Sequence, residues 1–152
     1  MIHRSGKSIA SFVSITGVAA CFVLTGCRQS GDEGNRLPVA GKVTFKDGKP
    51  LARGVVIFAP DGAKGNASLH EPRGPINADG NYILSTAARL DGVSAGWYIV
   101  TIIAQEPYDE SKSSWDPPWL INRKYGNRQT SGLAVEVIEN PEPARYDFLV
   151  TK

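Results

Sequence analysis

The chain has 152 residues, of which 17 are Lys or Arg and 15 are Asp or Glu. Two basic residues, Arg4 and Lys7, precede Cys27, whereas all the acidic residues follow it, so the part from Cys27 onward is formally neutral. Its densest basic cluster, within residues 123–128, is interpreted as a solvated loop. A chain without a broad basic face is not expected to bind nucleic acid, because neutralising phosphates requires such a face.

The first 26 residues have the order of an export signal. Arg4 and Lys7 form a cationic flank, and an uncharged apolar stretch runs from residue 8 to residue 26. Such a flank stays in the cytoplasm while the apolar segment enters the bilayer as a helix. The sequence Leu24-Thr25-Gly26-Cys27 resembles a bacterial lipobox, whose cysteine receives a diacylglyceryl group and an N-acyl chain such as palmitate.

This resemblance predicts a lipoprotein signal peptide over residues 1–26 and lipidation of Cys27. The protein would then be extracytoplasmic and anchored to a membrane, on the periplasmic side or at the cell surface. The alternative is an uncleaved membrane helix, because the run from 8 to 26 is just long enough to span roughly 30 Å of hydrocarbon. Five Ser or Thr and two Gly make this run a weak permanent anchor, so cleavage is favoured.

Cysteine usage predicts a fold without disulfides, and no cofactor is expected besides the covalent lipid on Cys27. Cleavage would remove Cys21, and lipid would occupy the thiol of Cys27, the only other cysteine. Residues 27–37 are predicted to be a flexible tether, which reaches roughly 17 Å as a random coil of about ten residues. The remaining residues, 38–152, suffice for one domain with a single core.

The domain is predicted to be all-β, because short alternating apolar segments bounded by Gly, Pro, Asn and Asp recur along it. The first segment, 39–45, would direct Val39, Val43 and Phe45 to one face. Segment 54–60 is apolar on both faces, so we expect it to be central and covered on both sides. Segment 67–76 contains two prolines, which restrict it to a sheet edge.

The later segments complete a set of roughly seven strands. They begin with 81–86 and with 97–104, the longest β-prone run and the best candidate for a core strand. Segment 133–137 and residues 146–150 alternate apolar and polar side chains. Two antiparallel sheets packed face to face would bury these sets.

Two Asp-Gly pairs mark turns between these segments. Asp47-Gly48 is predicted to give the left-handed geometry of a tight hairpin, and Asp79-Gly80 to occupy the left-handed positions of a second turn. The surrounding segment 77–81 also has three oxygen-bearing side chains, but it lacks the spacing to a bidentate Glu that a calcium loop requires.

Several segments together resemble a known family: VAGKVTFKDGKPLARGVVIFAP, GPINADGNYILST, DGVSAGWYIVTI, KYGNRQTSGLAVEV and YDFLV, in this order after a lipobox. They are similar to the carboxypeptidase regulatory-like lipoproteins of planctomycete bacteria. The resemblance implies a transthyretin-like or immunoglobulin-like β-sandwich outside the cytoplasm, and it carries over no catalytic residue.

Catalytic and metal-binding motifs are incomplete. Segment 92–96 fits G-x-S-x-G, but it precedes a strand, and His70, the one histidine after Cys27, lies upstream of Ser94. Pro72 follows His70-Glu71, and no second histidine completes a zinc-binding pair. We therefore expect no metal and no enzyme, since an enzyme would need a hidden constellation such as His70, Asp79 and Ser94.

The segment 105–127 is the main candidate for a contact site. Its aromatic side chains Tyr108, Trp115, Trp119 and Tyr125 stand among acids, amides and prolines. They could contact an envelope protein or a glycan, or they could fold back over one end of the domain. We expect a non-catalytic binding or scaffolding module, with a carbohydrate-binding module as the alternative. That alternative predicts that Trp115 and Trp119 are exposed and coplanar, and burial of both in the core would exclude it.

Overall fold

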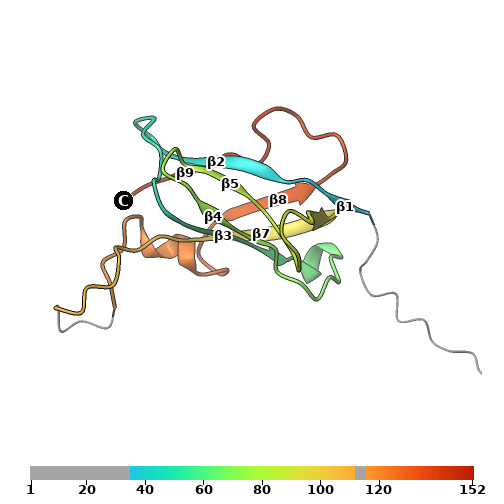
Figure 1. The fold of residues 1–152 in the computed structure, drawn as a ribbon. Helices are drawn as coiled ribbons and strands as arrows, with labels where there is room; N and C mark the ends of the chain where they lie inside the picture. Colours follow the sequence, from blue (N-terminus) through green and yellow to red (C-terminus); the bar gives the residue numbers. More distant parts are fainter. Residues whose placement is uncertain (1–34, 112–115) are drawn as a thin grey trace, which may run out of the picture.

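A computed structural model of the protein describes residues 35–111 and 116–152. The predicted signal peptide, Cys27 and Trp115 lie outside these residues. The described chain is all-β, as predicted, and contains two short 3-10 helices (Figure 1). Its elements are β1 (Arg36–Leu37), β2 (Ala40–Phe45), β3 (Gly54–Pro60), η1 (Gly62–Lys64), β4 (Arg73–Ile76), β5 (Asn81–Ile83), β6 (Val93–Ser94), β7 (Gly96–Ile103), η2 (Arg123–Gly126), β8 (Leu133–Val137) and β9 (Phe148–Val150). None of the described helices has the length and hydrophobicity needed to cross a membrane.

The larger sheet has four antiparallel strands in the order β4-β3-β7-β8. The predicted core strand is confirmed, because β7 lies between β3 and β8 and buries Tyr98, Val100 and Ile102 completely. The central position of β3 is also confirmed. The prediction that both of its faces are covered is wrong, because Val55 and Ile57 point away from the core and remain partly exposed.

β4 occupies the edge of this sheet, as its prolines predicted, but it is shorter than expected. It begins at Arg73 and pairs with β3 through Ile76, whereas residues 67–72 form no strand. Pro75 lies opposite Val55 in this edge strand. Proline has no backbone N–H to donate, and an edge strand tolerates it because no further strand of the sheet needs that hydrogen bond.

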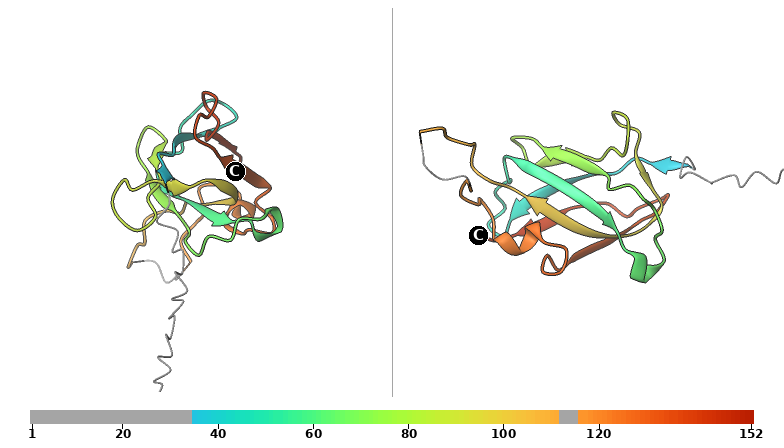
Figure 2. Two further views of the ribbon diagram at one scale, coloured as in Figure 1. Left: turned by 90° about the vertical axis from the view of Figure 1, so that its right-hand side faces the viewer. Right: turned by 90° about the horizontal axis from the view of Figure 1, so that it is seen from below.

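The second sheet has three strands in the order β5-β2-β9. β5 is antiparallel to β2, but β9 is parallel to it, with Val43 opposite Phe148 and Phe45 opposite Val150. The expectation of wholly antiparallel sheets is therefore wrong. The reason is topological: the chain leaves β8 at the end of the fold where β2 begins, and β9 starts from that same end (Figures 1 and 2).

Both predicted turns form, and the two have the same backbone geometry as each other. Gly48 donates from its backbone N to the Phe45 carbonyl at 2.9 Å, and Gly80 donates to the Asn77 carbonyl at 3.0 Å. Only the glycines are left-handed, with φ of 81° and 82°, so the predicted left-handed Asp47 and Asp79 are wrong. In each turn the residue before glycine keeps negative φ, and only glycine takes the strained position.

The first of these turns does not make a long hairpin. Thr44 pairs with Pro50 in an isolated bridge, and Leu51 donates to the Val43 carbonyl at 3.0 Å. The chain then passes to the other sheet, where β3 begins. β2 and β3 are therefore consecutive in sequence but belong to different sheets.

Both sheets direct side chains into one core. The ring of Phe58 in β3 meets the ring of Phe148 in β9 edge to face, with centroids 6.2 Å apart, and lies 5.7 Å from that of Tyr98. Tyr82 in β5 stacks on Phe148 at 6.4 Å. The predicted inward alternation is confirmed for Val135 and Val137 in β8 and for the residues around β9, namely Tyr146, Phe148 and Val150.

A two-stranded sheet of β1 and β6, which the sequence did not predict, closes one end of the fold. Arg36 pairs with Ser94 and Leu37 with Val93, and Leu37 belongs to the buried core. The predicted boundary of the tether at residue 37 is therefore too late, because Arg36 and Leu37 belong to the folded part. The pairs Arg36-Leu37 and Val93-Ser94 are too short to show an alternation from which a strand could be predicted.

Candidate functional site

The end of the fold opposite β1 brings together segments that are far apart in sequence. The turn after β2, the segment after β7 and the residues after β9 lie there, whereas the described chain begins at the other end (Figures 1 and 2). We call these the distal end and the proximal end.

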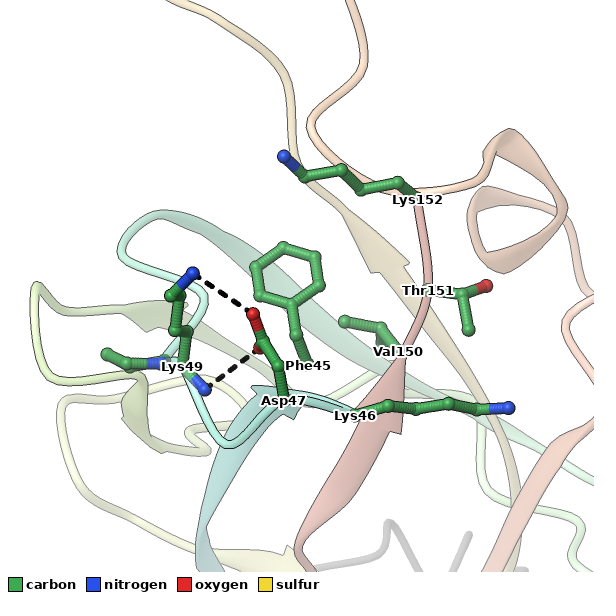
Figure 3. Close-up of a pocket in the computed structure, with 8 residues that line it drawn as sticks. Phe45, Lys46, Asp47, Lys49, Val150, Thr151 and Lys152 are labelled. Atoms are coloured by element: carbon green, nitrogen blue, oxygen red, sulfur yellow. Dashed lines mark hydrogen bonds and ion pairs between the residues drawn. The ribbon is translucent and has the colours of Figure 1, made fainter.

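A hollow of about 470 Å³ opens at the distal end. Its volume falls within the roughly 300–1,000 Å³ typical of small-molecule sites. It lies between the turn after β2 and the residues that follow β9 (Figure 3). We call it the Phe45 hollow; its lining residues are Phe45, Lys46, Asp47, Lys49, Pro50, Val150, Thr151 and Lys152.

The charges of the Phe45 hollow are mainly positive. Asp47 accepts a 3.2 Å hydrogen bond from the backbone N of Lys49 and forms a 3.1 Å ion pair with the Lys49 ammonium group. These contacts, the backbone hydrogen bond first, lower the pKa of the Asp47 carboxyl, so it stays ionised and compensates Lys49. The ammonium group of Lys152 lies 6.0 Å from the Phe45 ring centroid, while Lys46 points away from that ring (Figure 3).

This arrangement suits a ligand that has both an apolar and an anionic part. The half-buried ring of Phe45 offers an apolar surface, and the ammonium group of Lys152 beside it offers hydrogen-bond donors with positive charge.

The described parts of segment 105–127 are held against the distal end. Gln105 pairs with Trp119 in an isolated bridge, and the backbone N of Leu120 donates to the Ala104 carbonyl at 3.0 Å. The Asn122 side chain then caps η2 by accepting a hydrogen bond from Lys124 N at 3.1 Å. The segment therefore leaves β7 and returns to its end.

The four predicted contact residues do not form one surface. Tyr125 is only 5 % exposed and belongs to the core, so its assignment to a contact site is wrong. Tyr125 is the buried residue of η2, which contacts β7, and its hydroxyl lies 3.4 Å from Thr151 Oγ1. Tyr108 is 54 % exposed, Trp119 is half-buried against the core, and Trp115 lies outside the described residues.

Trp119 is fixed by its neighbours. A Cβ atom on Gly126 would lie 2.5 Å from its Cη2 atom, so the ring occupies the space that glycine leaves. The Arg123 guanidinium lies 5.6 Å from the ring centroid and donates to Asp116 at 2.9 Å. Gln105 donates to the same carboxylate at 3.1 Å. The folding back of aromatic side chains is thus confirmed for Tyr125 and, in part, for Trp119.

The catalytic constellation considered from the sequence is not assembled. Ser94 lies in β6 at the proximal end, and Asp79 lies in the turn after β4 at the distal end (Figure 1). The structural interpretation of the G-x-S-x-G segment is confirmed, since Gly92 and Gly96 have φ of 80° and 138° in a connection that enters β7. His70 is exposed in the loop before β4. No group of three potential ligands among His, Cys, Asp and Glu occurs in residues 35–111 and 116–152.

Sequence reasoning missed the Phe45 hollow. One signal was present: the stretch Phe45-Lys46-Asp47-Gly48-Lys49 places an aromatic residue and two lysines around a turn. The other wall comes from Thr151 and Lys152, which reach the turn only because β9 pairs in parallel with β2. A sequence pattern does not specify such a long-range pairing.

A scan against protein-family models and searches of the curated proteins and the solved structures found no match to this chain.

Proposed function

We propose that this protein is a lipid-anchored, extracytoplasmic binding module of the cell envelope, without catalytic activity of its own. Its two sheets would form a transthyretin-like β-sandwich of the carboxypeptidase regulatory-like kind, and its distal end would contact an envelope partner. Support for the fold comes from the shared core of the three-stranded and four-stranded sheets. Support for the anchor comes from the sequence that precedes Cys27.

The observation that carries this proposal is the placement of β1. Arg36 begins this strand at the proximal end, whereas the Phe45 hollow lies at the distal end (Figures 1 and 3). Trp119 pairs with Gln105, just after β7, and so lies at the distal end as well. A lipid on Cys27 would attach the protein from the proximal side. The hollow would then face away from the membrane, where an envelope protein or glycan can reach it.

Intact-mass spectrometry of the membrane fraction tests the anchor. The full chain should yield a species that begins at an acylated Cys27. Cys27→Ala should abolish acylation and normal processing, while Cys21→Ala, which changes a residue within the removed segment, should leave both intact. A membrane species that retains Met1 would instead support the uncleaved helix over residues 8–26.

A second candidate function is carbohydrate binding, favoured by the exposed Tyr108 and by the Gln105–Asp116–Arg123 network beside Trp119. Aromatic rings with adjacent polar groups commonly bind sugars through both stacking and hydrogen bonds. Co-sedimentation of the purified lipoprotein with envelope glycan would test it. Tyr108→Ala and Trp119→Ala should reduce binding, whereas Trp97→Ala, at the proximal end, should not. Retention by both distal variants would exclude this mode.

A further inference from the structure

The proximal end presents exposed leucine side chains. Leu69 is 93 % exposed in the loop that joins η1 to β4, and Leu90 is 61 % exposed in the loop that joins β5 to β6. Beside Leu90, a mostly apolar hollow of about 310 Å³ runs along β5 past Ile83 and Pro75 to Asn77, in the turn after β4. Single exposed leucines are common, but two on loops at one end, next to a larger apolar surface, form a candidate interaction site.

The loop that carries Leu69 has a defined conformation. Asn66 donates from Nδ2 to the Trp97 carbonyl at 2.8 Å, which ties the loop to β7. Ser68 N then donates to the Asn66 side chain at 3.0 Å, and His70 N to Ser68 Oγ at 3.2 Å. Successive side-chain turns therefore hold Leu69 outward.

The loop that carries Leu90 is held equally well. Leu90 has a φ of 60°, an unfavourable conformation for leucine, and its N donates to Ser85 Oγ at 2.9 Å. The Asp91 carboxylate accepts hydrogen bonds from Thr86, Ala87 and Ala88 and pairs with Arg36. An unfavourable backbone conformation of this kind persists only where the surrounding structure fixes it, so these hydrogen bonds hold Leu90 in its exposed position.

We propose that the proximal end rests on the lipid bilayer, with Leu69 and Leu90 entering its interfacial region. This inference depends on the proposed anchoring. Both loops lie at the end where β1 begins (Figures 1 and 2). Only eight residues separate Cys27 from Arg36, so the connection can span at most about 30 Å. A short tether gives the leucines an effective concentration near the bilayer of about millimolar or more. Two leucines are too few to hold a free protein on a membrane, but they suffice to orient a tethered one.

Single-cysteine labelling measures this contact directly. Acylation of Cys27 leaves no free thiol in the processed chain, because Cys21 is removed. Leu69→Cys and Leu90→Cys are labelled with bimane in the full lipoprotein, reconstituted in phosphatidylcholine vesicles with a quencher on the upper acyl chain. Leu149→Cys is the matched control, since Leu149 is 63 % exposed but lies in β9, which runs to the distal end.

We expect the labels at positions 69 and 90 to be quenched at least threefold more than the label at position 149. A label on Ala67→Cys should also be quenched, and it should lose most of that quenching when Leu69→Ser and Leu90→Ser are added. Equal quenching at positions 69, 90 and 149, or unchanged quenching at position 67 in the double-serine background, would overturn the proposal. Intact mass of each sample separates the two proposals: an unacylated chain refutes the anchor, whereas an acylated chain without differential quenching refutes only the orientation.

Discussion

The Tyr82 hydroxyl donates a 2.6 Å hydrogen bond to the backbone carbonyl of Tyr146 across 64 positions of sequence. Tyr82 lies in β5 and Tyr146 lies just before β9, so the bond joins the two strands that flank β2. Burial raises the pKa of the Tyr82 hydroxyl above its ordinary value, which keeps the group protonated as a donor. The contact closes the three-stranded sheet from its inner face.

Tyr82→Phe should destabilise the fold by about 1–3 kcal/mol, because it leaves the Tyr146 carbonyl without this donor in a buried position. Urea unfolding followed by circular dichroism gives the free energy. Tyr108→Phe removes a hydroxyl from an exposed ring and should change the stability by less than about 0.5 kcal/mol. Equal effects of the two substitutions would contradict the importance of the buried bond.

Gly41→Ala should lower the free energy of unfolding markedly, although it adds only one methyl group. A Cβ atom at position 41 would lie 2.1 Å from the Tyr146 carbonyl oxygen and 2.9 Å from the Tyr82 hydroxyl. The backbone must shift to admit it, at a cost of about 1–3 kcal/mol or more. Gly62→Ala is the control, because nothing lies within 4 Å of the added carbon and Gly62 is not left-handed. A stable Gly41→Ala protein with unchanged unfolding would show that β2 can move away.

Asp91→Asn should lower the Tm at neutral pH. Hydrogen bonds from the backbone N of Ala88, and then of Ala87 and Thr86, with the charge of Arg36, hold the pKa of the Asp91 carboxyl well below its ordinary value of 3.8. The lowered pKa means that the ionised form favours the folded state, so its contribution is complete above about pH 4 and is lost as the pH falls below that value.

Thermal scans from pH 7 to pH 2 check this dependence. The difference in Tm between the wild-type protein and Asp91→Asn should be largest above pH 4 and should shrink on acidification. Asp79→Asn, in an exposed turn, should follow the wild-type curve. A difference that grows as the pH falls would reverse the assigned sign.

Gly126→Ala should displace Trp119 without unfolding the sheets. The added carbon would lie 2.5 Å from Cη2 and 3.0 Å from Cζ3 of the indole, so the ring must leave its position against η2. We expect a change in near-ultraviolet circular dichroism and a red shift of tryptophan emission, with far-ultraviolet spectra retained. In a Trp119→Phe background the same glycine substitution should produce a much smaller spectral change. A spectrum unaffected by Gly126→Ala would place the indole elsewhere.

The sequence by itself determined the all-β class, the identity of the core strand and the positions of the two Asp-Gly turns. These features depend on local rules: side chains of Tyr98, Val100 and Ile102 alternate along one strand, and glycine takes left-handed φ at positions 48 and 80. The inward positions of Val135 and Val137 followed from the same alternation. Local physics acts over a few residues, so a single sequence is enough to reveal it.

Tertiary structure alone decided which strands pair and which aromatic side chains remain accessible. The parallel pairing of β2 with β9 brings Val150, Thr151 and Lys152 beside Phe45 and so creates the distal hollow. Tyr108 and Tyr125 look alike in sequence, but η2 buries Tyr125 while Tyr108 stays exposed. The physical reason is that burial and pairing depend on the free energy of the whole packed core, to which residues about a hundred positions apart contribute together.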